Sequence, residues 1–149
     1  MPNPNIKPSA LAPIMKVLDP ISQAAATVNT GWVSLADFDS ALAILMVGVL
    51  GAAATVDAKL QQATDSAGAG AKDITGKAIT QLTKAGTDDN KQVEINVRSD
   101  ELDVAGSFNH VRLQVTVAVA ASLISALVLG FNARYPTAAD STTVDEIVG

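Results

Sequence analysis

The chain has 149 residues, a hydrophobic fraction of 48%, an aromatic fraction of only 3%, and a formal net charge of −5. This length is enough for one domain with a closed core, which Ala and Val must fill with small and β-branched side chains. The acidic balance and the scattered Lys and Arg residues argue against a nucleic acid partner. The absence of cysteine excludes disulfides, thiolate metal sites and a cysteine nucleophile.

Residues 1–20 are predicted to form an extended N-terminal arm. Five prolines in this segment remove backbone donors and fix φ, which opposes both helix formation and strand pairing. The segment also carries apolar residues that a solvated tail rarely has, among them Ile6, Leu11, Ile14 and Met15. Two interpretations stay open: a loosely packed terminus, or an arm that lies on a neighbouring subunit.

Strand signals begin at Ile21, and the predicted domain runs from residue 21 to residue 135. Residues 41–50, ALAILMVGVL, are apolar at nearly every position. Such a run suits a strand covered on both faces or a short buried helix, and the glycines at its end favour the strand. Leu45 and Val47 are therefore candidate interface residues.

The stretch TVDAKLQQATDSAGAGAKDIT, residues 55–75, begins with strict alternation of apolar and polar residues and continues as a Gly- and Ala-rich loop. The alternation predicts a half-buried strand, and KAITQLT at residues 77–83 is predicted to pair back with it. Glycines at a hairpin tip allow a close approach to another backbone. The candidate contact residues at this tip are Asp65, Gly68, Gly70, Lys72 and Asp73, and a solvent-exposed turn is the alternative.

The later strands are predicted over residues 93–97, 111–120 and 123–132. Residues 113–133 carry no charge, yet the period-two alternation in residues 111–120 indicates a strand and argues against a membrane-spanning helix. The pattern of seven or eight strands predicts an all-β fold, an antiparallel β-sandwich that is jelly-roll-like, with immunoglobulin-like topology as the other possibility. Residues 136–149 are predicted to be a C-terminal tail.

Residues with catalytic potential are few. His110 is the single histidine and has no positioned partner in the sequence, and no GxSxG elbow presents a serine. The clustered carboxylates fall in predicted loops and lack the ligand density of a calcium loop. In AGAGAKD, residues 67–73, an Asp follows the Lys and a strand comes next, so it is not a phosphate-binding loop. The sequence predicts no enzyme activity, no cofactor and no bound metal.

One series of segments resembles small structural proteins of tailed bacteriophages. It comprises VDAKLQQATD, the Gly-rich tip, DITGKAITQ and HVRLQVTV, within residues 31–135. The resemblance implies a virion component, a cement or decoration protein on the outer surface of the capsid. Its implied partners are the major capsid protein and further copies of itself, as a dimer or trimer at a symmetry axis. Since small side chains let the hairpin tip lie close against another backbone, the tip is expected to reach a symmetry mate or the underlying shell.

Two rival functions stay open from the sequence. A phage head–tail connector or tail structural protein would share the β-rich fold but would form a small closed ring. A small non-viral β-sandwich binding module or enzyme is the other rival, and the scarcity of aromatic residues and of paired carboxylates counts against it.

Overall fold

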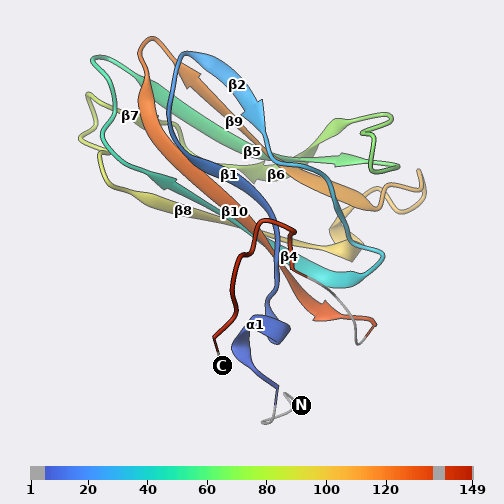
Figure 1. Cartoon of the computed structure of the whole chain (residues 1–149). Coiled ribbons are helices and arrows are strands. Elements are labelled where there is room, and N and C mark those ends of the chain that lie inside the picture. Colours follow the sequence, from blue (N-terminus) through green and yellow to red (C-terminus); the bar gives the residue numbers. More distant parts are fainter. Residues whose placement is uncertain (1–5, 136–139, 149) are drawn as a thin grey trace.

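The computed structural model describes residues 6–135 and 140–148, which form one β-sandwich (Figure 1). Two short helical turns accompany the strands: α1 (Pro8–Leu11) and the 3-10 turn η1 (Ser99–Glu101). The strands are β1 (Ile14–Gln23), β2 (Ala26–Asn29), β3 (Val33–Ser34), β4 (Phe38–Val47), β5 (Thr55–Ala63), β6 (Lys72–Ala78), β7 (Leu82–Thr83), β8 (Gln92–Arg98), β9 (His110–Ala118) and β10 (Ser122–Ala133).

The strands form two antiparallel sheets. Sheet A has the order β1-β10-β4-β8, and sheet B has the order β2-β9-β5-β6, with β3 paired to β9 and β7 paired to β5. The connections β1–β2, β4–β5, β7–β8 and β9–β10 lie at one end of the sandwich, and the β5–β6 tip lies at the other (Figure 1). The prediction of an all-β antiparallel sandwich is confirmed.

Strand pairing is nested along the chain. β1 pairs with β10, β2 and β3 with β9, β4 with β8, and β5 with β6 and β7. The chain is thus one long hairpin, and rolling it up adds the pairs β10–β4 and β5–β9. When β2 with β3, and β6 with β7, are counted as interrupted strands, the ten strands reduce to eight, four in each sheet. This is jelly-roll topology, and it decides against the immunoglobulin-like alternative.

The core lies between the sheets and consists mainly of Val, Leu and Ala side chains, and among the described residues Phe38 is its one buried aromatic ring. The predicted alternation is confirmed in three strands. On β5 the buried side chains are Val56, Ala58 and Leu60, on β8 Ile95 and Val97, and on β9 Val111, Leu113, Val115 and Val117. Because many core side chains are small, the sheets pack closely, and Gly130 of β10 lies directly against Phe38.

The interpretation of residues 1–20 as an extended arm is wrong from Ile14 onward. Residues 14–23 form β1, the edge strand of sheet A, which pairs with β10. Pro20 is tolerated because it falls in a register shift between Leu18 and Ile21, on an edge strand that needs fewer donors. Upstream, Pro8 is the first residue of the four-residue helix α1. A backbone N–H at this position has no acceptor within the helix, so proline is tolerated there.

The predicted C-terminal tail lies partly outside the described residues, at 136–139 and 149. The described part returns to the beginning of β1. The backbone N–H of Ile14 donates to Asp140 Oδ1 at 2.7 Å, and the N–H of Ser141 donates to the Ile14 carbonyl at 2.6 Å. Residues 140 and 141 therefore lie beside the start of β1. Among the described residues, no helix has the length and hydropathy that crossing a bilayer requires.

Replacing Gly130 by Ala is expected to destabilise the fold by about 1–3 kcal/mol, the usual cost of overpacking a tight core. A Cβ at this position would lie 2.6 Å from the Phe38 ring, and that ring is only 1% exposed and has no room to move. Chemical denaturation measures the effect. In the double variant with Phe38→Leu, the two changes should be less than additive, and full additivity would contradict the predicted clash.

Candidate functional site

The outer face of sheet A is aliphatic. Its middle strands place Leu42, Ile44 and Met46 of β4 beside Leu129, Leu127 and Ser125 of β10, and Val17 of β1 lies opposite Leu127. Leu123 continues the row on β10. Most of these side chains are half-buried by one another, and Met46 and Leu123 are 40% and 46% exposed. We call this surface, formed by Val17, Leu42, Ile44, Met46, Leu123, Leu127 and Leu129, the aliphatic face.

At one end of the aliphatic face the surface is hollowed. A groove of about 420 Å³ lies between the end of β1 and the neighbouring strands β4 and β10, lined mainly by Ile21, Met46 and Leu123 with two serines. Ile21 is itself 54% exposed. Along the edge of sheet A away from β1, the aliphatic face is bordered by β8, whose outward residues are polar: Gln92, Glu94, Asn96 and Arg98. An apolar surface with a polar rim is the usual anatomy of a protein-binding surface.

The prediction that the run 41–50 is covered on both faces, with Leu45 and Val47 at an interface, is wrong for the isolated chain. Leu45 and Val47 are 1% and 3% exposed and belong to the core, while the outward residues of β4 are half-buried or exposed. In an apolar run the residues on both faces of the strand are hydrophobic, so the sequence does not indicate which alternate residues point inward. The outward set became clear only from its pairing with β10.

The apolar residues of the predicted arm divide into two groups. Ile6 and Leu11 precede β1 and are 41% and 42% exposed. Ile14 and Met15 belong to β1 and are half-buried, and Met15 packs against the core. Of these four residues, Ile6 and Leu11 are the exposed ones, and their contact with another molecule stays a prediction.

The hairpin tip between β5 and β6 is organised by Asp65. Its Oδ1 accepts hydrogen bonds from the backbone N–H groups of Ala67 at 2.9 Å and Ala69 at 3.0 Å. The N–H of Ala69, followed by those of Ala67 and Gly68, holds the pKa of the Asp65 carboxyl below its ordinary value. The tip is a defined turn around a carboxylate.

The tip glycines lie against the chain's own side chains. Gly68 has φ +89°, and a Cβ there would lie 2.7 Å from Nε1 of Trp32, while a Cβ at Gly70 would lie 3.6 Å from the Phe108 ring. The close approach that the glycines permit is thus intramolecular. Lys72 forms an ion pair with Asp103 at 2.6 Å and lies 4.1 Å from the centroid of Phe108. Contact of the tip with a neighbouring subunit stays a prediction.

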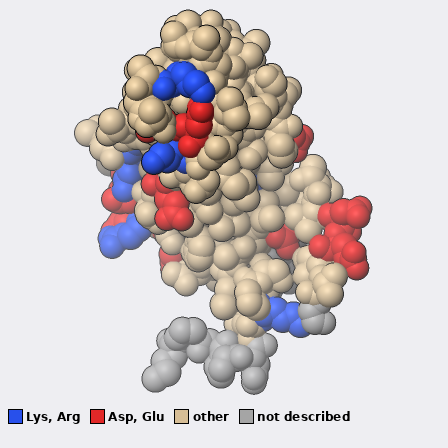
Figure 2. Space-filling model, turned by 90° about the vertical axis from the view of Figure 1, so that its left-hand side faces the viewer, with Lys and Arg blue, Asp and Glu red and all other residues tan. Residues whose placement is uncertain are grey.

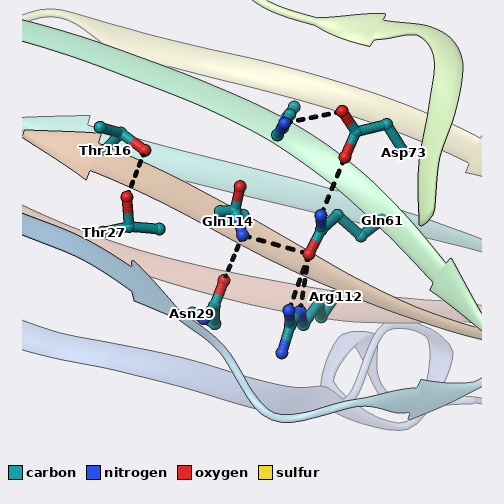
Figure 3. Close-up of polar contacts among 8 residues, drawn as sticks. Thr27, Asn29, Gln61, Asp73, Arg112, Gln114 and Thr116 are labelled. Carbon is teal, nitrogen blue, oxygen red and sulfur yellow. Dashed lines mark hydrogen bonds and ion pairs between the residues drawn. The ribbon is translucent and has the colours of Figure 1, made fainter. Parts of the chain in front are cut away.

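The outer face of sheet B is polar, in contrast to the aliphatic face (Figure 3). Gln114 of β9 donates from Nε2 to Asn29 Oδ1 at 3.1 Å and to Gln61 Oε1 at 3.2 Å. Arg112 donates to the same Gln61 oxygen at 3.0 and 2.8 Å, and its guanidinium lies 4.5 Å from the Trp32 ring centroid. Asp73, the last predicted tip residue, accepts from Lys59 at 2.6 Å and from Gln61 at 2.8 Å.

Charged side chains form small groups instead of a single patch. On the face drawn in Figure 2, they are separated by wide areas without charge. Six ion pairs, such as Lys77–Glu101 and Lys84–Asp89, account for most of the basic residues. Within residues 6–135 and 140–148, no group of three His, Cys, Asp or Glu side chains could hold a metal ion. His110 begins β9 and has Nδ1 2.6 Å from Asn109 Oδ1. The surface features that stand out are the two unlike outer faces.

Comparison with known proteins finds no matching family model and no matching curated protein. Among solved structures, a chain of the cryo-EM atomic structure of Broad bean stain virus is similar, with a TM-score of 0.49 and 8% sequence identity. The match covers 100% of this chain and 98% of the viral chain. At that TM-score the likeness carries no conclusion about what this chain binds.

Replacing Asp65 by Ala is expected to loosen the tip without unfolding the domain, because the N–H groups of Ala67 and Ala69 lose their acceptor. Amide hydrogen exchange of these two residues should accelerate, while Asp65→Asn, which keeps an acceptor oxygen, should change it less. Since the pKa of Asp65 is lowered in the folded chain, the ordering should be complete above its unfolded pKa and be lost as pH falls through the lowered value. Unchanged exchange in Asp65→Ala at neutral pH would show that the carboxylate does not organise the tip.

Proposed function

We propose that this protein is a structural component of a virion, a cement or decoration protein that binds the outer surface of a bacteriophage capsid. The observation that supports this role is the unequal chemistry of the two outer faces. A sandwich that is solvated on both sides usually carries polar residues across both outer faces. Here sheet B carries them, whereas in sheet A the outward residues of β8 are polar and those of β4 and β10 are mostly aliphatic. The aliphatic face suits burial against another protein.

In this proposal the aliphatic face lies on the major capsid protein and stabilises contacts between its subunits. The rows Leu42–Leu129 and Ile44–Leu127 give a flat apolar strip across β4 and β10. The groove at Ile21, Met46 and Leu123 would receive an apolar side chain of the shell. The polar outer face of sheet B would then remain in contact with water.

The proposed self-association, as a dimer or trimer at a symmetry axis, draws on the segment before β1. Ile6 and Leu11 are exposed there, on a part of the chain that forms no strand. Contact of these side chains with a neighbouring copy would bury apolar surface that the single chain leaves in water. A head–tail connector or tail structural protein remains the second candidate, and it would use the same surfaces in a closed ring.

Charged substitutions on the aliphatic face are expected to remove the chain from particles. Met46→Glu and Leu123→Glu alter partly exposed side chains, so the isolated domain should stay folded. An unpaired carboxylate buried at the contact should weaken binding at least about tenfold, which corresponds to ~1.4 kcal/mol. Thr27→Glu is the matched control, because Thr27 is exposed on the outer face of sheet B, and it should bind normally. Equal binding of all three variants would show that the aliphatic face is not the contact.

The copy number of this chain in purified particles tests the class of function. A cement protein should be present in amounts comparable to the major capsid protein, whereas a connector should be present in only a few copies. Absence of the chain from purified particles would overturn the virion proposal.

A further inference from the structure

The outer face of sheet B contains a depression that the capsid-binding role does not use. It has a volume of about 310 Å³ and is lined by Asp57, Ala58, Lys59, Ala78, Ile79, Gln114 and Thr116. It lies beside the place where the β5–β6 pairing changes register, between Lys59 and Gln61. This volume is at the small end of the range for ligand sites and matches one or two small rings.

The polar groups of this depression are held in place by their neighbours. Gln114 is fixed by Asn29 and Gln61, Lys59 by Asp73 at 2.6 Å, and Thr116 by Thr27 at 2.9 Å (Figure 3). Asp57 accepts from Gln81 Nε2 at 2.7 Å. Side chains that are already ordered lose little conformational entropy when a ligand binds.

The side chains of Gln114, Asp57 and Lys59 keep hydrogen-bonding groups that the anchoring bonds do not use. Gln114 spends its amide nitrogen on the network, so its Oε1 remains an acceptor. Asp57 uses Oδ2, which leaves Oδ1, and the Lys59 ammonium has donors beyond the one given to Asp73. Within the described residues, no hydrogen bond engages Gln114 Oε1 or Asp57 Oδ1. The depression thus offers acceptors and a donor side by side, with Ala78 and Ile79 as an apolar wall.

This combination selects a class of ligand. Hydroxyl groups both donate and accept, so a ligand with several hydroxyls can use the acceptors and the donor together. The carboxylates Asp57 and Asp73 disfavour phosphates and other anions, and a wholly apolar ligand would leave the polar groups without partners. The apolar wall suits the C–H surface of a sugar ring. The Trp32 ring does not line the depression, and Arg112 lies over it at 4.5 Å from the ring centroid.

We propose that the outer face of sheet B binds a neutral carbohydrate in the depression bounded by Asp57, Lys59, Gln114 and Ile79. Single sites of this kind bind weakly, and many copies on one particle would add avidity. All residues of the site belong to a single chain, so sugar binding can be tested separately from the capsid-binding role.

The test is a titration of the isotope-labelled full chain with glucose, galactose, mannose and N-acetylglucosamine, followed by NMR. At least one sugar should shift the amide signals of Asp57, Lys59, Ile79 and Gln114 in a saturable way, in the millimolar range. Inorganic phosphate should not shift them.

Gln114→Met keeps the length of the side chain and removes both its acceptor and the Nε2 hydrogen bonds to Asn29 and Gln61. It should weaken sugar binding at least about five- to tenfold, the effect of one hydrogen bond lost to the ligand. Gln92→Met, on exposed β8 of the opposite sheet, is the matched control and should bind like the unaltered chain. The proposal is overturned if no sugar shifts these signals, if phosphate shifts them instead, or if both variants bind equally well. The same spectra report whether each variant is folded.

Discussion

The pairing of β4 with β10 is the interaction on which the rest of this structure depends. These strands are distant in sequence, and their register aligns Ile124 with Val47 and Ala133 with Phe38 along almost their full length. On the inner side the pairing closes the core, with Gly130 admitting the Phe38 ring. On the outer side it brings together the leucines and isoleucine of the aliphatic face. A slip of one residue would exchange the two sides, so core and candidate interface are specified by the same register.

A core built mostly of Val, Ala and Leu has a further consequence. Small side chains allow the sheets to lie close together, and stability comes from many modest contacts instead of a few large rings. With no cysteine in the chain, no disulfide supplements them. Additional burial against a partner is then a direct way to stabilise the molecule, and the aliphatic face offers the surface for it.

In the proposed role, the two outer faces of the sandwich have different functions. Burial against a shell would remove the apolar surface of the aliphatic face from water. The face of sheet B is polar and hydrogen-bonded, so covering it with an apolar surface would remove its remaining polar groups from water without giving them partners. The face left in water is also the one with the ordered polar depression. A chain attached through sheet A would present that depression outward, and this links the two proposals geometrically while their tests stay independent.

Local patterns were sufficient to predict the class of fold, and the inward residues wherever polar and apolar residues alternate. On β5, β8 and β9 the period of two identified the buried face, since only one assignment puts apolar side chains inside. Local patterns did not determine the orientation of β4, because an all-apolar run has no polar side, nor the fate of residues 14–20, where prolines resemble those of a free arm. The Gly-rich tip was predicted as a close contact, but its partner, Trp32, is far away in sequence. Jelly-roll topology, the aliphatic face and the polar depression all arise from pairings between strands that are distant in sequence. These pairings could not be predicted, because local patterns fix the face of a strand but not its neighbour.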